Sequence, residues 1–134
     1  MDLYAENILD HYRHPRGKQT PASPSVVHEE INASCGDTLT LQMTVKDGKI
    51  TEVGWEGTGC AISQAAMSML TEELQGKSLD DVEKLQKEYV HELLGVPVGP
   101  RRFKCALLGL HTLKNAVRKY RGDAVQGWSE TIGN

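Results

Sequence analysis

The stretch Thr38-Leu39-Thr40-Leu41-Gln42-Met43-Thr44-Val45-Lys46-Asp47-Gly48-Lys49 decides the fold of this chain of 134 residues. Apolar and polar residues alternate up to Lys46, which is the pattern of a β-strand with one buried face and one face in water. Asp47-Gly48 then supplies a two-residue turn, because both residue types tolerate positive φ angles. The pattern predicts a hairpin whose second strand spans 49–56, with a bulge near Thr51 because Ile50 is out of phase.

A further strand and several helices flank this hairpin. Residues 26–34 are the expected first strand of a three-stranded antiparallel meander. After Gly59 the apolar period changes from about 2 to about 3.6 residues, which indicates helices. We therefore predict an α+β fold, with the sheet covered on one side by about four helices. The expected helices span 3–13, 60–75, a segment that begins at Ser78, and a segment from about 105 to Tyr120. Residues 1–134 should form a single domain with a flexible tail from about 121, where three glycines occur.

Three cysteines lie in settings that suit metal or sulfur chemistry. Cys35 opens the turn Cys35-Gly36-Asp37, whereas Cys60 and Cys105 lie at expected helix starts. The unpaired amides and positive dipole end of a helix N-terminus favour the thiolate, and Arg101, Arg102 and Lys104 act on Cys105 in the same direction. The alternative is that all three are small buried residues of the core. Their neighbours favour a functional role.

The meander brings these residues to one end of the sheet. In an antiparallel meander, the first strand and the third strand finish at the same end of the sheet. Cys35, Asp37 and Cys60 can therefore converge, and the helix near Cys105 can complete the site. Three thiolates and one carboxylate form a four-ligand set that suits either zinc or a [2Fe–2S] cluster. Gly57 and Gly59 are either turn glycines or positions where the backbone approaches a bulky group.

Composition excludes several classes of protein. The net charge of −3 gives no basic field for nucleic acid, and no apolar run approaches the ~20 residues of a membrane helix. The N-terminal residues lack the pattern of a secretory signal, so we expect a cytoplasmic protein with no membrane partner. The odd number of cysteines argues against a disulfide framework, and their wide spacing argues against a zinc-finger module.

The five histidines are expected to be surface or packing residues and not metal ligands. His111 lies six residues past Cys105 and on a different face of the expected helix, and the others lie in the N-terminal segment, on a strand or in a polar helix end. Those near the first expected helix stop have a slightly better claim than the rest. The five are His11, His14, His28, His91 and His111.

Four segments then stand out in order along the chain: Tyr4 with Ile8-Leu9-Asp10-His11-Tyr12 and Pro15-Arg16; Asn32-Ala33-Ser34-Cys35-Gly36-Asp37; Gly57-Thr58-Gly59-Cys60-Ala61-Ile62-Ser63-Gln64-Ala65-Ala66-Met67-Ser68; and Arg102-Phe103-Lys104-Cys105-Ala106-Leu107-Leu108. Together they resemble the motifs of the iron–sulfur cluster assembly scaffold family, which comprises the IscU, SufU and NifU N-terminal proteins. The resemblance spans about residues 3–120, and the second cysteine motif is the most specific.

The resemblance implies a scaffold or carrier and not an enzyme in the strict sense. A cysteine desulfurase would deliver persulfide sulfur, with Cys35 and Cys105 as candidate acceptors. Cys35, Asp37, Cys60 and Cys105 would hold a labile [2Fe–2S] cluster, or Zn²⁺ in the cluster-free form. Asp37 would keep the cluster exchangeable for transfer to apo iron–sulfur proteins.

One residue departs from the IscU pattern. Lys104 stands where IscU proteins carry histidine, and SufU proteins carry lysine there. SufU proteins also carry an extra stretch between the second and third cysteines, which this chain lacks. The alternative function is therefore a zinc-dependent sulfur acceptor, or sulfurtransferase, that relays persulfide without building a cluster. We expect that Lys104 does not bind metal, since its amine is protonated. It either stabilises the Cys105 thiolate or is a solvated surface lysine.

Overall fold

The computed structural model describes residues 3–33 and 36–133. Its three strands are β1 (Val26–Asn32), β2 (Asp37–Lys46) and β3 (Lys49–Thr58), paired antiparallel in the order β1-β2-β3. The helices are α1 (Leu3–Arg13), α2 (Ala61–Leu74), α3 (Leu79–Glu83), α4 (Lys87–Leu94), the short 3-10 helix η1 (Pro100–Arg102), α5 (Phe103–Tyr120) and α6 (Trp128–Thr131). The expected α+β class and the three-stranded meander are confirmed.

The hairpin forms as its sequence predicts. Asp47 has a φ of 54° and Gly48 a φ of 75°, the left-handed values that a tight two-residue turn requires. Thr44 pairs with Glu52 and Val45 pairs with Ile50, so Thr51 is the extra residue of a bulge on β3. The bulge rotates Ile50 into the core, where its side chain is fully buried.

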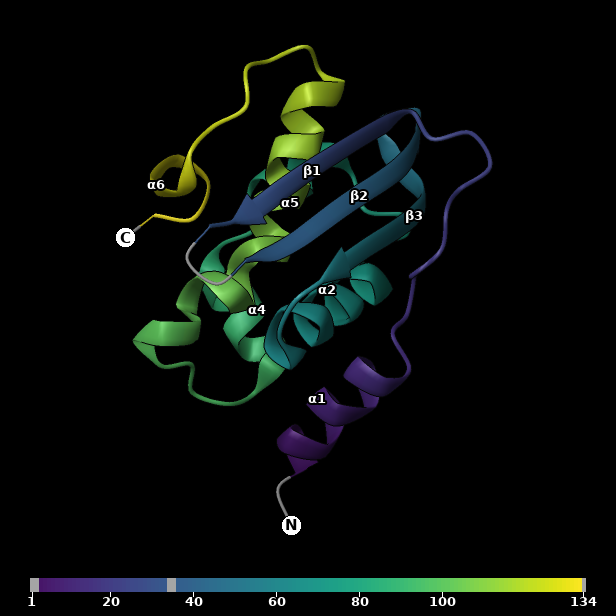
Figure 1. Ribbon diagram of the computed structural model, residues 1–134. Helices are drawn as coiled ribbons and strands as arrows, with labels where there is room; N and C mark the ends of the chain where they lie inside the picture. The colour runs from purple at the N-terminus through teal and green to yellow at the C-terminus, as the bar shows by residue number, and fades with distance from the viewer. Residues whose placement is uncertain (1–2, 34–35, 134) are drawn as a thin grey trace.

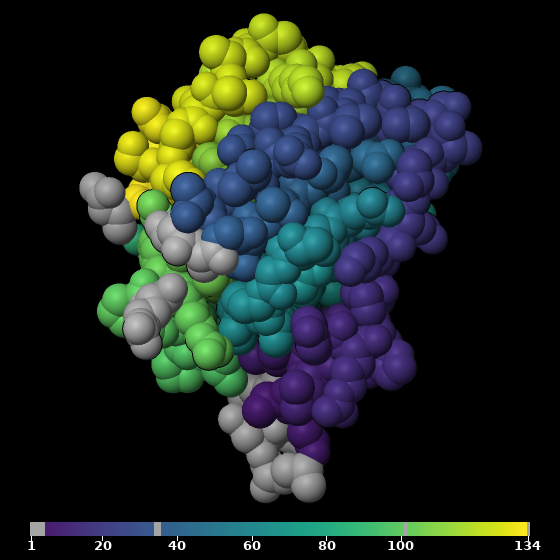
Figure 2. Space-filling model, in the orientation of Figure 1, coloured from purple at the N-terminus to yellow at the C-terminus, as the bar shows by residue number. Residues whose placement is uncertain are grey.

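The helices cover one face of the sheet and leave the other open. In Figure 1, α2 and α5 lie behind the three strands, and Figure 2 shows the strands forming an uncovered surface at the front. Leu39, Leu41 and Met43 of β2 point into the core between the sheet and these helices, and they are fully buried. Within the described parts of the chain, no helix combines the length and apolar character needed to cross a membrane.

Helix α1 packs on α2 with only part of its apolar surface. Leu9 and Tyr12 are 42% and 46% exposed, whereas Ile8 and His11 are buried. His11 is therefore a packing histidine. Its burial is possible because α2 offers a hydroxyl partner, and a buried polar group is stable only when it is hydrogen-bonded.

Ser68 of α2 connects α1 to the segment that follows it. The Ser68 hydroxyl accepts a hydrogen bond from the Arg16 amide at 2.8 Å and shares a hydrogen bond with Nδ1 of His11 at 2.7 Å. The other ring nitrogen of His11, Nε2, lies 3.3 Å from Oε1 of Glu72. Trp55 extends the connection to the sheet, because its indole Nε1 donates to the Arg16 carbonyl at 2.7 Å.

The tail after about residue 121 makes several contacts with α5, and its expected flexibility in solution stays a prediction. The Gln126 amide donates to Oδ1 of Asn115 at 2.8 Å, and Nδ2 of Asn115 returns a bond to the Gln126 carbonyl at 2.9 Å. Trp128 stacks on His111 with ring centroids 4.2 Å apart. Thr131 and Ile132 are buried. These contacts join residues distant in sequence, so local composition gave no sign of them.

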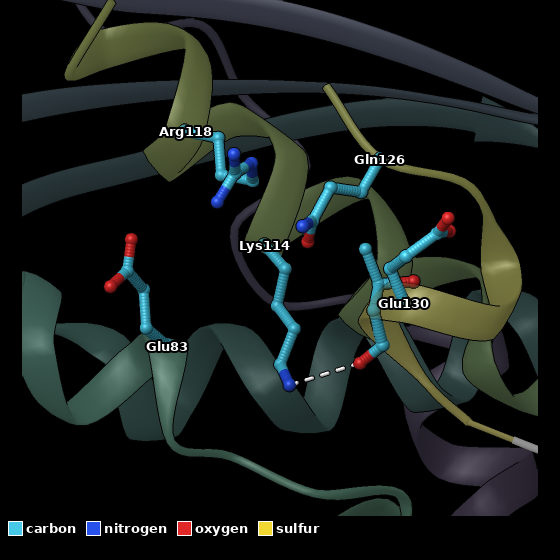
Figure 3. Close-up of a pocket in the computed structure, with 6 residues that line it drawn as sticks. Glu83, Lys114, Arg118, Gln126 and Glu130 are labelled. Carbon is cyan, nitrogen blue, oxygen red and sulfur yellow. Dashed lines mark hydrogen bonds between the residues drawn. The ribbon is translucent and has the colours of Figure 1, made fainter. Parts of the chain in front are cut away.

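A small polar cavity lies where the tail meets α3 and α5. The Lys114 ammonium donates to the Thr131 carbonyl at 3.0 Å, and burial lowers the pKa of Lys114. Figure 3 shows this contact together with the charged side chains around it. The cavity has a volume of about 180 Å³ and is lined by Glu83, Lys114, Arg118, Gln126, Glu130 and Thr131. The tail is thus held by polar contacts as well as by the Trp128 ring.

The buried histidines predict a pH-dependent stability. Burial lowers the pKa of His11, and likewise of His111, below the usual value of 6.5. Between the folded and unfolded pKa values the unfolded chain binds more protons, so the free energy of unfolding decreases as the pH falls through about 6.5. We expect a lower urea midpoint at pH of about 5.5 than at about 7.5. His11→Gln should reduce this difference, whereas His14→Gln, at an exposed position, should not. A midpoint that is unchanged or higher at the lower pH would contradict the prediction.

The tail contacts predict a second outcome. Trp128→Ala removes the ring that stacks on His111, so we expect the free energy of unfolding to fall by about 1–3 kcal/mol, less than for a fully buried ring. Amide hydrogen exchange of residues 128–133 should become faster. Val125→Ala, at an exposed position of the same tail, is the matched control. Exchange that is equally fast in the wild-type protein would show that the tail is not docked in solution.

Candidate metal and sulfur site

Three of the four expected site residues meet at one end of the sheet. Asp37 is the first residue of β2, Cys60 is the N-cap of α2, and Cys105 lies in the first turn of α5. One ligand atom from each, the two sulfurs and a carboxylate oxygen, lie within 4.8 Å of one another. Cys35, the fourth expected residue, lies outside the described residues. The roles of all four as ligands stay a prediction.

The register of β2 and β3 brings Asp37 to Cys60. Thr38 pairs with Thr58, so the preceding residue of β2 faces the segment that leads from β3 into α2. The Asp37 carboxylate is buried, and its Oδ1 accepts a hydrogen bond from the Cys60 amide at 3.1 Å. Its other oxygen, Oδ2, lies 3.9 Å from Sγ of Cys60. The bond satisfies the buried carboxylate and fixes the start of α2.

Gly59 allows this close approach. Its φ is 148°, and a Cβ at this position would overlap the carboxyl group of Asp37 and lie 2.9 Å from its Cβ. Gly57 is similar, since a Cβ there would lie 2.6 Å from the carbonyl oxygen of Thr38. Both are therefore positions where another part of the chain approaches the backbone, and the approach of a bulky cluster to them stays a prediction.

Cys105 is buried beside an asparagine that sequence reasoning did not select. Asn32, the last residue of β1, is itself buried, and its Nδ2 lies 4.0 Å from Sγ of Cys105. This is the long distance of an N–H···S contact, and such a donor stabilises a thiolate. The signal available in the sequence was an amide three residues before Cys35, at the end of the first strand.

Lys104 is exposed, and its ammonium lies 5.6 Å from the centroid of the Trp128 ring. This cation–π contact ties the start of α5 to the tail, and the sequence did not predict it. The proposed effect of Lys104 on the Cys105 thiolate stays a prediction.

Two histidines, partly buried His28 and buried His111, contact Glu30 of β1. Nε2 of His28 lies 2.6 Å from Oε2 of Glu30, and Nε2 of His111 lies 3.4 Å from Oε1 of the same carboxylate. Burial tends to raise the pKa of Glu30, but hydrogen bonds from His28 and Asn115 outweigh it and lower the pKa. These contacts occupy the imidazoles away from the cysteines.

The donor set fits a metal ion that prefers sulfur. The two sulfurs and the carboxylate oxygen lie within 4.8 Å of one another, and two thiolates bound to one tetrahedral zinc ion at 2.3 Å would lie ~3.8 Å apart. Among residues 3–33 and 36–133, this is the only group of three or more His, Cys, Asp or Glu side chains with ligand atoms so close together. The side chains of Asp37, Cys60 and Cys105 can therefore act together as donors to one metal ion at this end of the sheet.

Comparison with known proteins shows which family has this sequence and this fold. The family model described as NifU-like N terminal domain matches residues 3–126. The chain is similar to the zinc-dependent sulfurtransferase SufU of Bacillus subtilis, with 33% identity over 90% of this chain and 92% of the relative. It is also similar to the iron–sulfur cluster assembly scaffold protein IscU of Thermotoga maritima, with 31% identity over 87% of this chain and 94% of the relative. A crystal structure of a SufU-type scaffold from Fervidobacterium islandicum aligns with a TM-score of 0.74 and 30% identity, covering 84% of this chain and 94% of that one. The chain therefore belongs to the NifU-like N-terminal domain family, the family of IscU and SufU iron–sulfur cluster scaffolds.

Proposed function

We propose that this protein is a scaffold on which a [2Fe–2S] cluster is assembled and from which it is passed to apo-proteins. The observation that carries the proposal is the placement of a buried carboxylate oxygen among cysteine sulfurs at one end of the sheet. A closed structural zinc site uses Cys and His alone, whereas a hard oxygen ligand weakens the hold on a sulfur-rich cargo. A cluster held by Cys35, Asp37, Cys60 and Cys105 would be stable enough to form and labile enough to leave.

Sulfur would come from the persulfide of a cysteine desulfurase. The thiolate of Cys35 or Cys105 attacks the outer sulfur of that persulfide, a new S–S bond forms, and the desulfurase cysteine leaves as a thiolate. The step moves one sulfur atom without net oxidation. Reduction of this sulfur to sulfide for a cluster requires an electron donor, and iron must be supplied as well. The cluster's recipients would be apo iron–sulfur proteins.

The second candidate is a zinc-dependent sulfur acceptor. Two observations favour it: the relative from Bacillus subtilis carries that name, and this chain has Lys104 beside its third cysteine. In that case Zn²⁺ at the same residues would be the working metal, and the product would be a protein persulfide. The expected cytoplasmic location and the expected lack of a nucleic-acid partner stay predictions under either function.

Anaerobic reconstitution separates the two functions. The full chain is incubated with ferrous iron, cysteine, a thiol reductant and a cysteine desulfurase, and visible absorption and zinc content are followed. Visible absorption bands of a [2Fe–2S] cluster, with loss of zinc, support the scaffold. Sulfur uptake with zinc retained and no cluster band supports the sulfur acceptor. A protein that forms no cluster and takes up no sulfur would overturn both functions.

Asp37→Ala tests the release of the cluster from the proposed site. Removal of the only oxygen donor described in the site should slow loss of the cluster to a chelator, because the remaining donors are thiolates. The half-life of the visible absorption in the presence of the chelator is the measurement. Asp123→Ala, an exposed carboxylate in the tail, is the control. A half-life that is equal or shorter in Asp37→Ala would show that Asp37 does not promote release.

Gly59→Ala tests the packing that holds Asp37. The new methyl group would overlap the Asp37 carboxyl, so the carboxylate must move away from the Cys60 amide. We expect Zn²⁺ affinity, measured by competition with a colorimetric chelator, to fall by about tenfold or more. Gly99→Ala is the control, since a Cβ there meets nothing within 4 Å. Equal affinity in both variants would contradict the assigned role of Gly59.

A further inference from the structure

Gln64 of α2 is a buried amide whose donor has no partner. Its side chain is 6% exposed, and its Nε2 is buried without a hydrogen-bond partner in the described structure. An unpaired buried donor costs about 1–3 kcal/mol, so a polar residue is unexpected here unless something else pairs with it. Leucine or methionine would fill the same space in the core without this cost.

The unpaired amide lies beside the metal and sulfur site. Nε2 of Gln64 is 3.4 Å from the position that a Cβ of Gly57 would occupy, and Gly57 pairs with Leu39 of β2. Residues two apart on a strand share a face, so the next residues on this face are Asp37 and Gly59, which contact each other. The carboxamide therefore lies over Gly57, at the end of the sheet that also carries Asp37.

Helix α2 also places Gln64 close to a cysteine of the site. The backbone N–H of Gln64 donates to the backbone carbonyl of Cys60 at 3.2 Å, which closes the first turn of the helix. Side chains four residues apart lie on one side of a helix. The carbonyl oxygen of Thr38 also borders the Gly57 position, which favours the NH₂ end of the carboxamide over its oxygen end on this side.

We propose that the Gln64 carboxamide is a hydrogen-bond donor to anionic sulfur bound in the site, kept unpaired until that sulfur arrives. The proposal rests on the function proposed above. The acceptor is either the thiolate of a metal-bound cysteine or the inorganic sulfide of the cluster, since both are anionic sulfur that accepts N–H donors. Gln64 would act as a binding residue for the cargo and not as a metal ligand.

This role predicts opposite effects of one substitution on the empty and the loaded protein. Gln64→Met fills the same volume without the unpaired donor, so the metal-free variant should have a higher melting temperature than the wild-type protein. The loaded variant should lose its cargo faster. Partners in the outer shell of a metal site contribute about 10–100-fold to affinity, so we expect at least a severalfold effect. Substitution of a residue needed only for packing would not both stabilise the metal-free protein and weaken retention of the cargo in the loaded protein.

The experiment compares the wild-type protein, Gln64→Met and Gln64→Glu in three states: metal-free, loaded with Zn²⁺ alone, and carrying a reconstituted [2Fe–2S] cluster. Melting temperature is measured for the first, chelator competition for the second, and cluster half-life and reduction potential for the third. Gln75→Met, at an exposed position at the other end of α2, is the matched control. Gln64→Glu keeps the shape but presents a carboxylate to the sulfur, so it should retain cargo less well than Gln64→Met.

The outcomes distinguish the two candidate acceptors, the thiolate and the sulfide. They also distinguish failure of this proposal from failure of the proposed function. Weaker retention of both Zn²⁺ and the cluster in Gln64→Met identifies the thiolate as acceptor. A faster loss of the cluster alone, with a more negative reduction potential, identifies the sulfide. A lower melting temperature of metal-free Gln64→Met, or cargo retention equal to that of Gln75→Met, overturns the assignment while the proposed function stands. A wild-type protein that takes up neither Zn²⁺ nor a cluster overturns both.

Discussion

The pairing register of β2 and β3 is the constraint on which the site depends. A shift of one residue would move every side chain of β2 to the opposite face, so the burial of Leu39, Leu41 and Met43 fixes a single register. The turn at Asp47-Gly48 and the bulge at Thr51 make the two strands consistent with this burial. At the other end of the hairpin, the same register places the Asp37 carboxylate against the amide of Cys60.

The site then stands at the meeting point of rigid elements. Cys60 begins α2, Cys105 lies in the first turn of α5, and the end of the β2–β3 pair supplies the carboxylate. The cores of both helices are buried, so the cysteines at their starts have little freedom to move. A pre-arranged donor set reduces the ordering cost of binding. The oxygen donor in that set has the opposite effect on a sulfur-rich cargo, because it is a hard ligand on a soft site.

Polar side chains are buried at several points of the helical layer. Among residues 3–33 and 36–133, the buried side-chain nitrogen and oxygen atoms without a hydrogen-bond partner are Nε2 of Gln64 and Nε2 of His91. Ser68 and His11 join α1 to α2, and Asn115 joins the tail to α5 and to Glu30 of β1. Each such bond requires a specific geometry, so these pairs select one arrangement of the helices where apolar contact alone would allow several. The buried donor of Gln64 departs from this rule, and it does so next to the cysteines. Departures from local consistency are expected at functional sites.

The sequence by itself determined the strands, the turn, the bulge and the starts of the helices at the cysteines. These features follow from periods of about 2 and 3.6 residues and from the φ preferences of single residues, which are local properties. The four motifs also identified the family, because their spacing along the chain is independent of how the helices pack.

Only the tertiary structure decided which side chains fill the interfaces. The exposure of Leu9 and Tyr12, the docking of Trp128 on His111 and the position of Asn32 beside Cys105 all join residues far apart in the chain. The same is true of the overlap that requires glycine at position 59, since its cause is the carboxyl group of Asp37. Periodicity shows that a residue is apolar and on one face of an element. It cannot show which element packs against that face, because that choice depends on the combined shape and hydrogen bonding of the whole fold.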